Sequence, residues 1–375
     1  MDALMLPLNW QRVRLGDIGK PCMCKRVMKH QTTRYGEIPF YKIGTFGNTA
    51  DAFISKKLFL EYKTKYSFPK KGDILISASG TIGRAVIYDG KPAYFQDSNI
   101  VWIDNDETLV KNDFLFYAYS NVKWNTEHTT ILRLYSDNFR NTLIPLPPLN
   151  EQAAIANVLS DVDRYLYSLD ALILKKESVK KALSFELLSQ RKRLKGFNQV
   201  WQKVRLGDIC EITTGSLDAN EMVHYGKYRF YTCAKEYYFI DKYAFDTEAI
   251  LISGNGAYVG YVHYYKGKFN AYQRTYVLDN FSEHIIFVKY FLTMFLQSHI
   301  QTNRNEGNTP YIVMATLKDF EILLPPLNEQ IAIANILSAL DNEIISLKNK
   351  KRQFENIKKA LNHDLMSAKI RVLNK

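Results

Sequence analysis

Two sequence blocks each occur twice in this chain, in the same order, and this duplication constrains the fold more than any other feature. Residues 10–18 read WQRVRLGDI and residues 201–209 read WQKVRLGDI, which match at eight of nine positions. Residues 146–160 read LPPLNEQAAIANVLS and residues 324–338 read LPPLNEQIAIANILS, which match at thirteen of fifteen positions. A repeat of about 180 residues is too long for a solenoid. We therefore predict a duplicated domain.

The segments between the blocks differ far more than the blocks do, yet they keep traces of one fold. The blocks are offset by 191 and 178 residues, so the first segment is longer by 13 residues. Residues 73–80 (DILISASG) correspond to residues 249–256 (AILISGNG). Both read as a buried strand that leads into a glycine turn. We expect two α/β domains of one fold with different surfaces.

Each LPPLNEQ block is followed by a segment with helical periodicity. Proline sits well just before a helix, and we expect Asn150 and Asn328 to be N-caps, with Glu151 and Glu329 in the first turns. Apolar residues then alternate at spacings of four and three, which is the heptad pattern of a helix–helix seam. The predicted seam residues are Ile155, Leu159, Val162, Leu166, Leu169, Ile173, Ile333, Leu337, Leu340, Ile344, Leu347, Phe354 and Leu361.

The two predicted helices suggest an antiparallel arrangement. Each can run about 40 residues, or roughly 60 Å at 1.5 Å per residue. The first helix carries the chain from the first domain to the second domain. If the pair is antiparallel, the second helix runs back toward the first domain. The fold class is then α+β: two duplicated α/β domains, related by a pseudo-two-fold axis, joined by two long helices in an antiparallel coiled coil. The alternative is that each helix is an ordinary amphipathic helix packed on its own domain.

Composition indicates a class of binding partner and a cellular compartment. The formal net charge is +12 and aromatic residues make up 13% of the chain, which together favour a polyanion such as nucleic acid. A low-GC genome would enrich Lys, Asn, Tyr and Phe without such a cause. The four cysteines (22, 24, 210 and 233) have neither disulfide-framework nor zinc-site spacing. We see no signal peptide and no membrane span, so we expect a reduced, metal-free and cofactor-free cytoplasmic protein.

Sequence signatures of catalysis are missing. We find no [DN]-P-P-[YF] run, no glycine-rich dinucleotide or methyl-donor fingerprint and no GxxxxGK[ST] phosphate loop. The seven histidines form no HExxH arrangement. We therefore predict a protein that is not an enzyme.

The duplicated blocks resemble those of a known family, the specificity subunits of type I restriction–modification enzymes. The resemblance covers nearly the whole chain and is carried by W-x-x-V-x-L-G-D-I at Trp10 and Trp201, by P-P-L-x-E-Q-x-x-I-A at Pro147 and Pro325, and by the two-fold order of variable and repeated segments. It implies a subunit that reads a bipartite asymmetric DNA site. Its implied partners are double-stranded DNA, two copies of a methylating subunit and, where restriction occurs, two copies of an ATP-dependent restriction subunit.

This resemblance assigns the parts of the chain. Residues 1–148 form the first target-recognition domain, residues 149–196 the first conserved helix, residues 197–326 the second target-recognition domain and residues 327–375 the second conserved helix. The helices act as a spacer and a docking surface.

DNA contacts are expected from two kinds of residue. Loop lysines and arginines position phosphates, whereas polar side chains near the glycine turns read bases. The phosphate candidates are Lys25, Arg26, Lys29, Arg34, Arg84, Lys227, Arg229, Lys235 and Arg274. The base-reading candidates are Ser79, Thr81, Gln96, Asn99, Asn255, Tyr258 and Gln273. Each of them can also be read as a solvated surface residue.

Two other functions remain open at this point. The chain can be a non-catalytic coiled-coil scaffold whose globular ends bind other proteins, which a salt-sensitive DNA-binding test separates from DNA reading. It can also be a single-chain DNA methyltransferase or nuclease, which a turnover assay decides.

Overall fold

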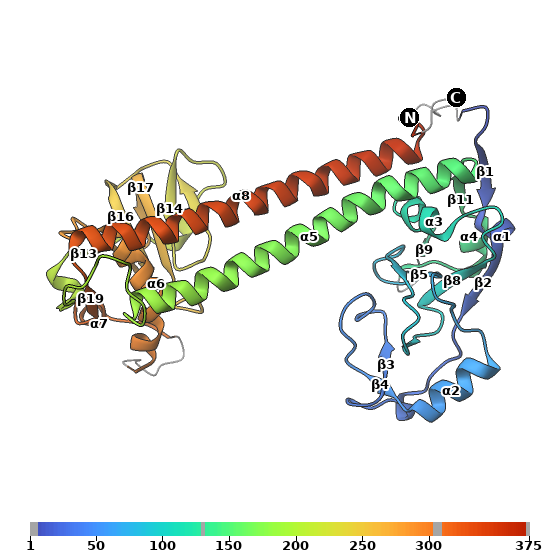
Figure 1. Cartoon of the computed structure of the whole chain (residues 1–375), viewed down its shortest axis with the longest axis horizontal. Coiled ribbons are helices and arrows are strands. Elements are labelled where there is room, and N and C mark those ends of the chain that lie inside the picture. Colours follow the sequence, from blue (N-terminus) through green and yellow to red (C-terminus); the bar gives the residue numbers. More distant parts are fainter. Residues whose placement is uncertain (1–6, 129–131, 303–309, 373–375) are drawn as a thin grey trace. The chain divides into compact units, whose positions relative to one another are not determined.

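The chain divides into two compact units of α+β structure. The computed structural model describes residues 7–128, 132–302 and 310–372. Unit 1 consists of residues 1–170 and 350–375, and unit 2 of residues 171–349. Each unit holds one mixed α/β domain and half of each long helix, α5 (Leu149–Leu188) and α8 (Leu327–Met366) (Figure 1). The predicted α+β fold class, with two duplicated domains and two long helices, is confirmed.

In unit 1 the sheet is split in two. One part has the antiparallel order β2 (Gly19–Met23), β8 (Ile100–Asn105), β5 (Ile74–Ser77) and β6 (Ala85–Ile87). The other has the order β4 (Phe53–Ile54), β3 (Ile38–Tyr41) and β7 (Tyr94–Phe95), with β3 and β7 parallel. Two smaller ribbons complete the strands: β1 (Gln11–Arg14) with β11 (Leu143–Leu146), and β9 (Glu127–His128) with β10 (Leu132–Arg133).

The short helices of unit 1 lie at the ends of these strands. They are α1 (Leu15–Ile18), η1 (Lys29–Gln31), α2 (Lys56–Lys65), α3 (Asn112–Tyr119) and α4 (Ser136–Asn141). Helix α2 stands between β4 and β5, where unit 2 has no helix, and it accounts for most of the extra length of the first segment.

In unit 2 one six-stranded sheet repeats the plan. Its order is β13 (Glu211–Thr214), β18 (Thr275–Asp279), β16 (Phe245–Ser253), β17 (Val262–Ala271), β14 (Tyr228–Tyr231) and β15 (Tyr238–Ile240). A separate ribbon pairs β12 (Gln202–Arg205) with β19 (Glu321–Leu324), as β1 pairs with β11. The helices are η2 (Leu206–Asp208), η3 (Ala219–Glu221), α6 (Ile285–Thr302) and α7 (Met314–Lys318).

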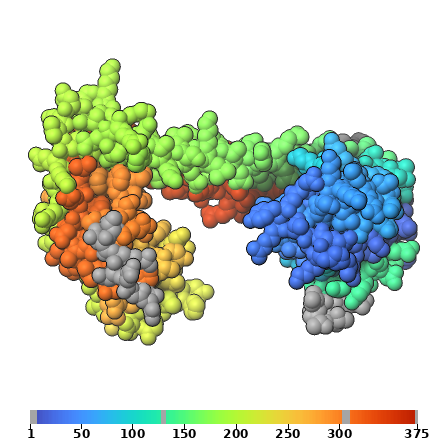
Figure 2. All heavy atoms as spheres, turned by 90° about the horizontal axis from the view of Figure 1, so that it is seen from below, coloured from blue at the N-terminus to red at the C-terminus, as the bar shows by residue number. Residues whose placement is uncertain are grey.

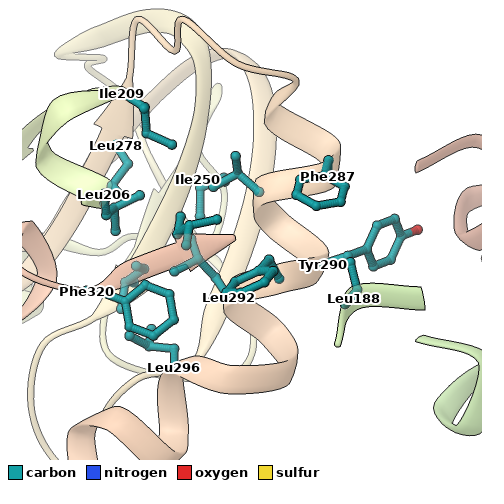
Figure 3. Close-up of a cluster of buried hydrophobic side chains, with 14 of the residues drawn as sticks. Leu188, Leu206, Ile209, Ile250, Leu278, Phe287, Tyr290, Leu292, Leu296 and Phe320 are labelled. Atoms are coloured by element: carbon teal, nitrogen blue, oxygen red, sulfur yellow. The ribbon is translucent and has the colours of Figure 1, made fainter. Parts of the chain in front are cut away.

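Burial explains why the shared ILIS run forms a central strand. All four residues of β5 are buried, as are their counterparts at the end of β16. Apolar β-branched residues suit a strand that is covered on both faces. In unit 2, Phe287 and Leu292 of α6 lie next to Ile250 of β16, and Leu296 of α6 lies next to Phe320 in the same buried cluster (Figure 3). In unit 1, α3 covers β5 in the same way.

The long helices begin where the predicted helical segments begin, but their caps differ from those expected. Their first residues are Leu149 and Leu327, so Asn150 and Asn328 lie inside the first turn and the N-cap prediction is wrong. The cap is instead a proline carbonyl: Pro148 accepts from the amides of Glu151 and Gln152. A proline suits this position because its carbonyl can accept hydrogen bonds from the first turn of the helix, and because it has no backbone N–H that would need a partner.

Each long helix spans 40 residues, in agreement with the predicted length of about 40 residues. Helix α5 ends at Leu188 and α8 at Met366. Two residues later Gln190 (φ 62°) and Ala368 (φ 57°) adopt the left-handed conformation, which reverses the chain. The amides of Lys192 and Ile370 then close the turn on the carbonyls of Glu186 and Asp364.

Within each unit α5 and α8 are antiparallel. In unit 1, Asp163 pairs with Lys358 and Asp170 pairs with Lys351. Residue numbers therefore fall along α8 as they rise along α5. In unit 2, Lys176 pairs with Glu343 and Lys180 with Asp341 in the same sense.

The predicted seam residues are all buried or half-buried. The buried ones are Ile155, Leu159, Leu169, Ile173, Ile333, Leu337 and Ile344, and the half-buried ones are Val162, Leu166, Leu340, Leu347, Phe354 and Leu361. Ile155 and Leu159 also belong to the core of the first domain, and Ile333 and Leu337 to that of the second. Each helix therefore packs both on its own domain near its start and on the other helix.

Candidate nucleic-acid interface

A fixed set of backbone hydrogen bonds holds the glycine turn of unit 1. After β5, the carbonyl of Ser77 accepts from the amide of Gly83, and the amide of Ala78 donates to the carbonyl of Asn99 at 2.7 Å. The carbonyl of Ala78 accepts from Leu134. The Ser77 hydroxyl donates to the carbonyl of Thr81 and accepts from the amide of Arg84.

Unit 2 repeats this framework with other residues. The carbonyl of Ser253 accepts from Gly260, and the amide of Gly254 donates to the carbonyl of Arg274 at 2.8 Å. The carbonyl of Gly254 accepts from Ile312. Isolated bridges match as well, since Ser79 pairs with Arg133 in unit 1 and Asn255 with Tyr311 in unit 2. We call these two frameworks, residues 77–84 and 253–261 with the strands that hold them, the first and second loop frames.

The first loop frame brings together five of the predicted DNA residues. The Ser79 hydroxyl donates to Asn99 Oδ1 at 2.8 Å, and Gln96 Oε1 accepts from the amide of Ile43 at 2.9 Å. Arg84 is exposed, and its guanidinium donates to the carbonyl of Gly47 at 3.3 Å. Ser79 is buried, so it holds the loop, while Thr81 is exposed.

The basic residues at positions 25–34 are less closely associated with this frame. Arg26 reaches it through an ion pair with Asp97 at 2.8 Å. The ammonium of Lys25 lies over the ring of Tyr66 at 5.1 Å. Lys29 and Arg34 are exposed, and no contact in the described residues ties them to the loop frame. In Figure 2 these N-terminal residues fall in the blue part of the chain, which forms much of the visible surface of unit 1.

In the second loop frame the predicted residues also gather. The ammonium of Lys235 lies 5.1 Å from the ring centre of Tyr258, which is exposed on the glycine turn. Asn255 is half-buried, and Arg274 is exposed. Gln273 is exposed and donates to Asp218 at 2.7 Å.

Arg229 has a different environment from that expected of a loop phosphate ligand. It lies in β14, and its guanidinium stands between the rings of Tyr237 and Tyr265, at 4.2 and 4.4 Å from their centres. Its Nη1 also donates to the Tyr231 hydroxyl at 3.4 Å. Arginine stacked in this way braces the sheet. Lys227 precedes the same strand and is exposed.

Burial favours the neutral forms of one histidine and one cysteine. Burial lowers the pKa of His263, which packs edge-on against Tyr231 and Tyr261. Burial also raises the pKa of Cys24, beside Lys25, to about 12. The charge of each frame is therefore carried by its exposed lysines and arginines.

The repeated blocks make a contact with each other that the sequence analysis did not predict. Trp10 Nε1 donates to Glu151 at 3.0 Å, and Trp201 Nε1 donates to Glu329 at 3.2 Å. Both glutamates are buried. The recurrence of the two blocks at opposite ends of each domain was the available signal, because residues that are kept together in two copies suit a shared contact.

The neighbouring glutamines fasten the helices to their domains. Gln152 donates to the carbonyls of Leu109 and Pro147 and accepts from the amide of Lys111. Gln330 donates to the carbonyl of Pro325 and accepts from the amide of His284. Each side chain thus satisfies backbone groups at a buried joint.

The described residues contain no group of three or more His, Cys, Asp or Glu side chains placed to hold a metal ion. Among the helices of the same residues, none is both long and apolar enough to cross a bilayer.

The chain matches a known family model over most of its length. The model, described as the type I restriction modification DNA specificity domain, matches residues 7–176 and 198–356. A Haemophilus influenzae protein assigned as a type I restriction enzyme specificity subunit is 62% identical over 148 residues, which is 39% of this chain. The chain spans 38% of that relative's length. The type I restriction enzyme MjaVIII specificity subunit of Methanocaldococcus jannaschii is 26% identical over 423 residues, covering 100% of this chain and 96% of that protein.

A solved structure has the same fold. The crystal structure of a type I restriction-modification system S subunit from M. genitalium aligns with a TM-score of 0.65. The alignment covers 96% of this chain and 98% of that one, at 18% sequence identity.

Proposed function

This chain belongs to the family of the type I restriction modification DNA specificity domain, and from that premise we propose that it reads a bipartite, asymmetric DNA site for a restriction–modification complex in the cytoplasm. Each domain reads one half-site. The domains are residues 1–148 and 197–326, and the segments 149–196 and 327–375 supply the helices that join them.

One observation carries this proposal: two equivalent loop frames present different side chains. The backbone contacts of Ser77 and Ser253 recur, as described above. The exposed residues differ, with Thr81 and Arg84 in the first frame and Tyr258 and Arg274 in the second. A constant backbone framework that carries different polar and basic side chains suits two domains that read different base pairs.

The proposed partners are DNA and the subunits that act on the DNA site. The subunit reads sequence and has no catalytic group or cofactor of its own. Two methylating subunits modify the site, and two ATP-dependent restriction subunits join where cleavage occurs. DNA itself is the ligand of the basic loops, whose phosphate contacts release counterions.

A salt titration with a domain exchange tests the proposal. The chain with its methylating partner should bind duplex DNA with an affinity that falls steeply between low and physiological salt. Exchanging residues 19–145 for the same segment of a relative should change one half-site and leave the other. A flat salt response contradicts DNA reading, and a swap that alters both half-sites contradicts independent domains.

The same experiment separates the alternative of a protein-binding scaffold. A scaffold has no reason to bind duplex DNA in a salt-dependent and sequence-dependent way. Protein capture without any DNA preference would favour the scaffold.

A further inference from the structure

A short turn beside the first loop frame carries two side-chain amides on a fixed backbone. Residues 96–99 connect β7 to β8, and Ser98 in this turn has a left-handed conformation with φ of 52°. The backbone amide of Gln96 donates to a carbonyl of β3, and the carbonyl of Asn99 accepts from the residue that follows β5. We call residues 96–99 the first reading turn.

The oxygen atoms of both amides are already engaged by the protein. Gln96 Oε1 accepts from the backbone amide of Ile43 at 2.9 Å, and Asn99 Oδ1 accepts from the buried Ser79 hydroxyl at 2.8 Å. The two ends of a carboxamide point in different directions, so an oxygen fastened to the fold leaves the nitrogen to meet a ligand. Among the described residues, neither Gln96 Nε2 nor Asn99 Nδ2 has a hydrogen-bond partner, and neither nitrogen is enclosed by the protein.

The carboxylate of the same turn is also engaged. Asp97 pairs with Arg26 at 2.8 Å, and only 16% of the Asp97 side chain is exposed. The remaining side chain, Ser98, is exposed, and its hydroxyl can donate as well as accept. The first reading turn therefore presents mainly N–H donors.

The equivalent turn of unit 2, residues 272–275, presents its glutamine the other way round. Its backbone position is the same, since the carbonyl of Arg274 accepts from the residue after β16's ILIS run as that of Asn99 does after β5. Gln273 Nε2 donates to Asp218 at 2.7 Å, so its oxygen is the end left to meet a ligand. Gln273 is exposed. The two turns therefore differ in hydrogen-bonding polarity as well as in sequence.

We propose that the first reading turn recognises guanine in the major groove through Gln96 Nε2 and Asn99 Nδ2. This rests on the proposed function and names the base chemistry of its first half-site. The major-groove edge of guanine has two acceptors, O6 and N7, and no donor. Adenine and cytosine would each place an amino group against these N–H groups, which is unfavourable. The outward oxygen of Gln273 instead suits an amino group of adenine or cytosine.

Gln96→Glu reverses the polarity of one amide and keeps its contact with the fold. One carboxylate oxygen still accepts from the amide of Ile43, while the other replaces the N–H donor with an acceptor. The full chain with its methylating partner is used to select duplexes from a random pool. One guanine of the first half-site should change to cytosine, whose N4 amino group donates, and affinity for the original site should fall about tenfold or more.

Two further variants make the result specific. Asn99→Asp still accepts from Ser79 and should change a second guanine in the same way. Gln31→Glu is the matched control, because Gln31 Oε1 accepts from the backbone amide of Met28 at 2.9 Å in the same domain. It adds the same charge outside the reading turn and should leave the selected bases unchanged.

Thermal melts of every variant separate altered reading from misfolding. If Gln96→Glu melts below the wild type, Asn99→Asp decides the question. Selection of the wild-type first half-site by a folded Gln96→Glu or Asn99→Asp complex, at wild-type affinity, overturns the proposal. A wild-type first half-site made only of A·T pairs overturns it as well, as does a change confined to the second half-site. A wild-type complex that selects no sequence at all refutes the proposed function itself.

Discussion

The guanidinium of Arg371 binds the carboxylate of Glu151, 220 residues earlier in the chain, with Nη2 donating to Oε2 at 2.8 Å. The same guanidinium lies 5.9 Å from the ring centre of Trp10. Arg193 makes the equivalent contacts with Glu329 and Trp201 in unit 2. The two arginines are 178 residues apart, so each repeat supplies the arginine that completes the other repeat's tryptophan–glutamate pair.

Removing Arg371 should destabilise the first domain and leave the second unchanged. Only 3% of the Glu151 side chain is exposed, so Arg371→Ala would leave a nearly buried carboxylate with Trp10 as its remaining partner. Losing one partner of a buried pair costs about 3–5 kcal/mol, and we expect about 2–4 here because Arg371 is itself partly exposed. Hydrogen exchange resolved by segment would measure the loss.

Arg193→Ala is the matched control, with its effect confined to the second domain. The double change Arg371→Met with Glu151→Gln should recover part of the loss, because no charge then remains buried. Equal protection of both domains in Arg371→Ala would contradict the assignment.

The network at Asp341 should make unit 2 sensitive to acid. Burial raises the pKa of Asp341, but hydrogen bonds from Lys180 and Tyr290 and the charge of Lys180 outweigh burial, so the net pKa of Asp341 lies below the ordinary value of an aspartate. A carboxyl with a lowered folded pKa stabilises the folded state above its unfolded pKa, and the contribution is lost as pH falls through the folded value. Stability of unit 2 should therefore drop below about pH 4.

Asp341→Asn tests this assignment. The variant should be less stable at pH 7, and its acid-induced loss of stability below pH 4 should be shallower than that of the wild type. Thermal melts between pH 2.5 and 7 follow both effects. A parallel pH dependence in the two proteins would show that other carboxyls control acid unfolding.

Gly83→Ala should disable the first loop frame and spare the second. Gly83 has φ of 83°, and a Cβ there would lie 2.0 Å from Trp124 Nε1, whose ring packs against Tyr119 and Phe139. Both the left-handed backbone and the ring must then shift. We expect at least about a tenfold loss of affinity for the first half-site, with the second half-site still read. Footprinting of each half-site would measure the two effects.

Gly256→Ala is the control within the same fold. Its φ of 80° is equally unfavourable for alanine, but a Cβ there meets nothing within 4 Å. Gly256→Ala should lower the affinity for the second half-site less than Gly83→Ala lowers the affinity for the first. An equal loss in both variants would assign the Gly83 effect to backbone strain alone.

Local patterns predicted the elements better than the contacts between distant residues. The heptad spacing indicated the helix pair, because apolar residues at that spacing fall on one face. The same pattern could not show that Lys180 and Lys358 have acidic partners, since this depends on how two distant helices align. The Trp10–Glu151 contact joins residues 141 positions apart, and no local signal encodes it. No glycine marks the left-handed turn after α5, because Gln190 adopts that conformation.

Prediction of the candidate site divides in the same way. Loops next to a buried strand end are expected to cluster, and Ser79 and Asn99 do so through a direct side-chain hydrogen bond, whereas Gln96 accepts from the backbone amide of Ile43. The stacking of Arg229 between two tyrosines depends on the order of strands in the sheet, which composition does not reveal. Which of these side chains contact DNA stays a prediction.

The duplication itself predicts that a fragment of residues 1–196 folds and forms a symmetric dimer. Antiparallel packing of two identical helices gives an isologous interface. A lysine in the helix seam, Lys180, would oppose this dimer if like charges met there. Lys358 pairs with Asp163, and Lys180 is its counterpart in the first repeat. In the dimer Asp163 would therefore face Lys180 of the partner subunit.

The same offset of 178 residues identifies a repulsion that would weaken this dimer. Glu177 pairs with Lys348, whose counterpart in the first repeat is Asp170, so two carboxylates would face each other twice in the dimer. Asp170→Lys replaces each repulsion with an ion pair, and we expect about tenfold tighter dimerisation at low salt, less at high salt. Sedimentation at tens of micromolar measures this. With the methylating subunit, the dimer should mark a palindrome of the first half-site. A fragment that stays monomeric with either residue at position 170, or a dimer that still marks the asymmetric site, would contradict the prediction.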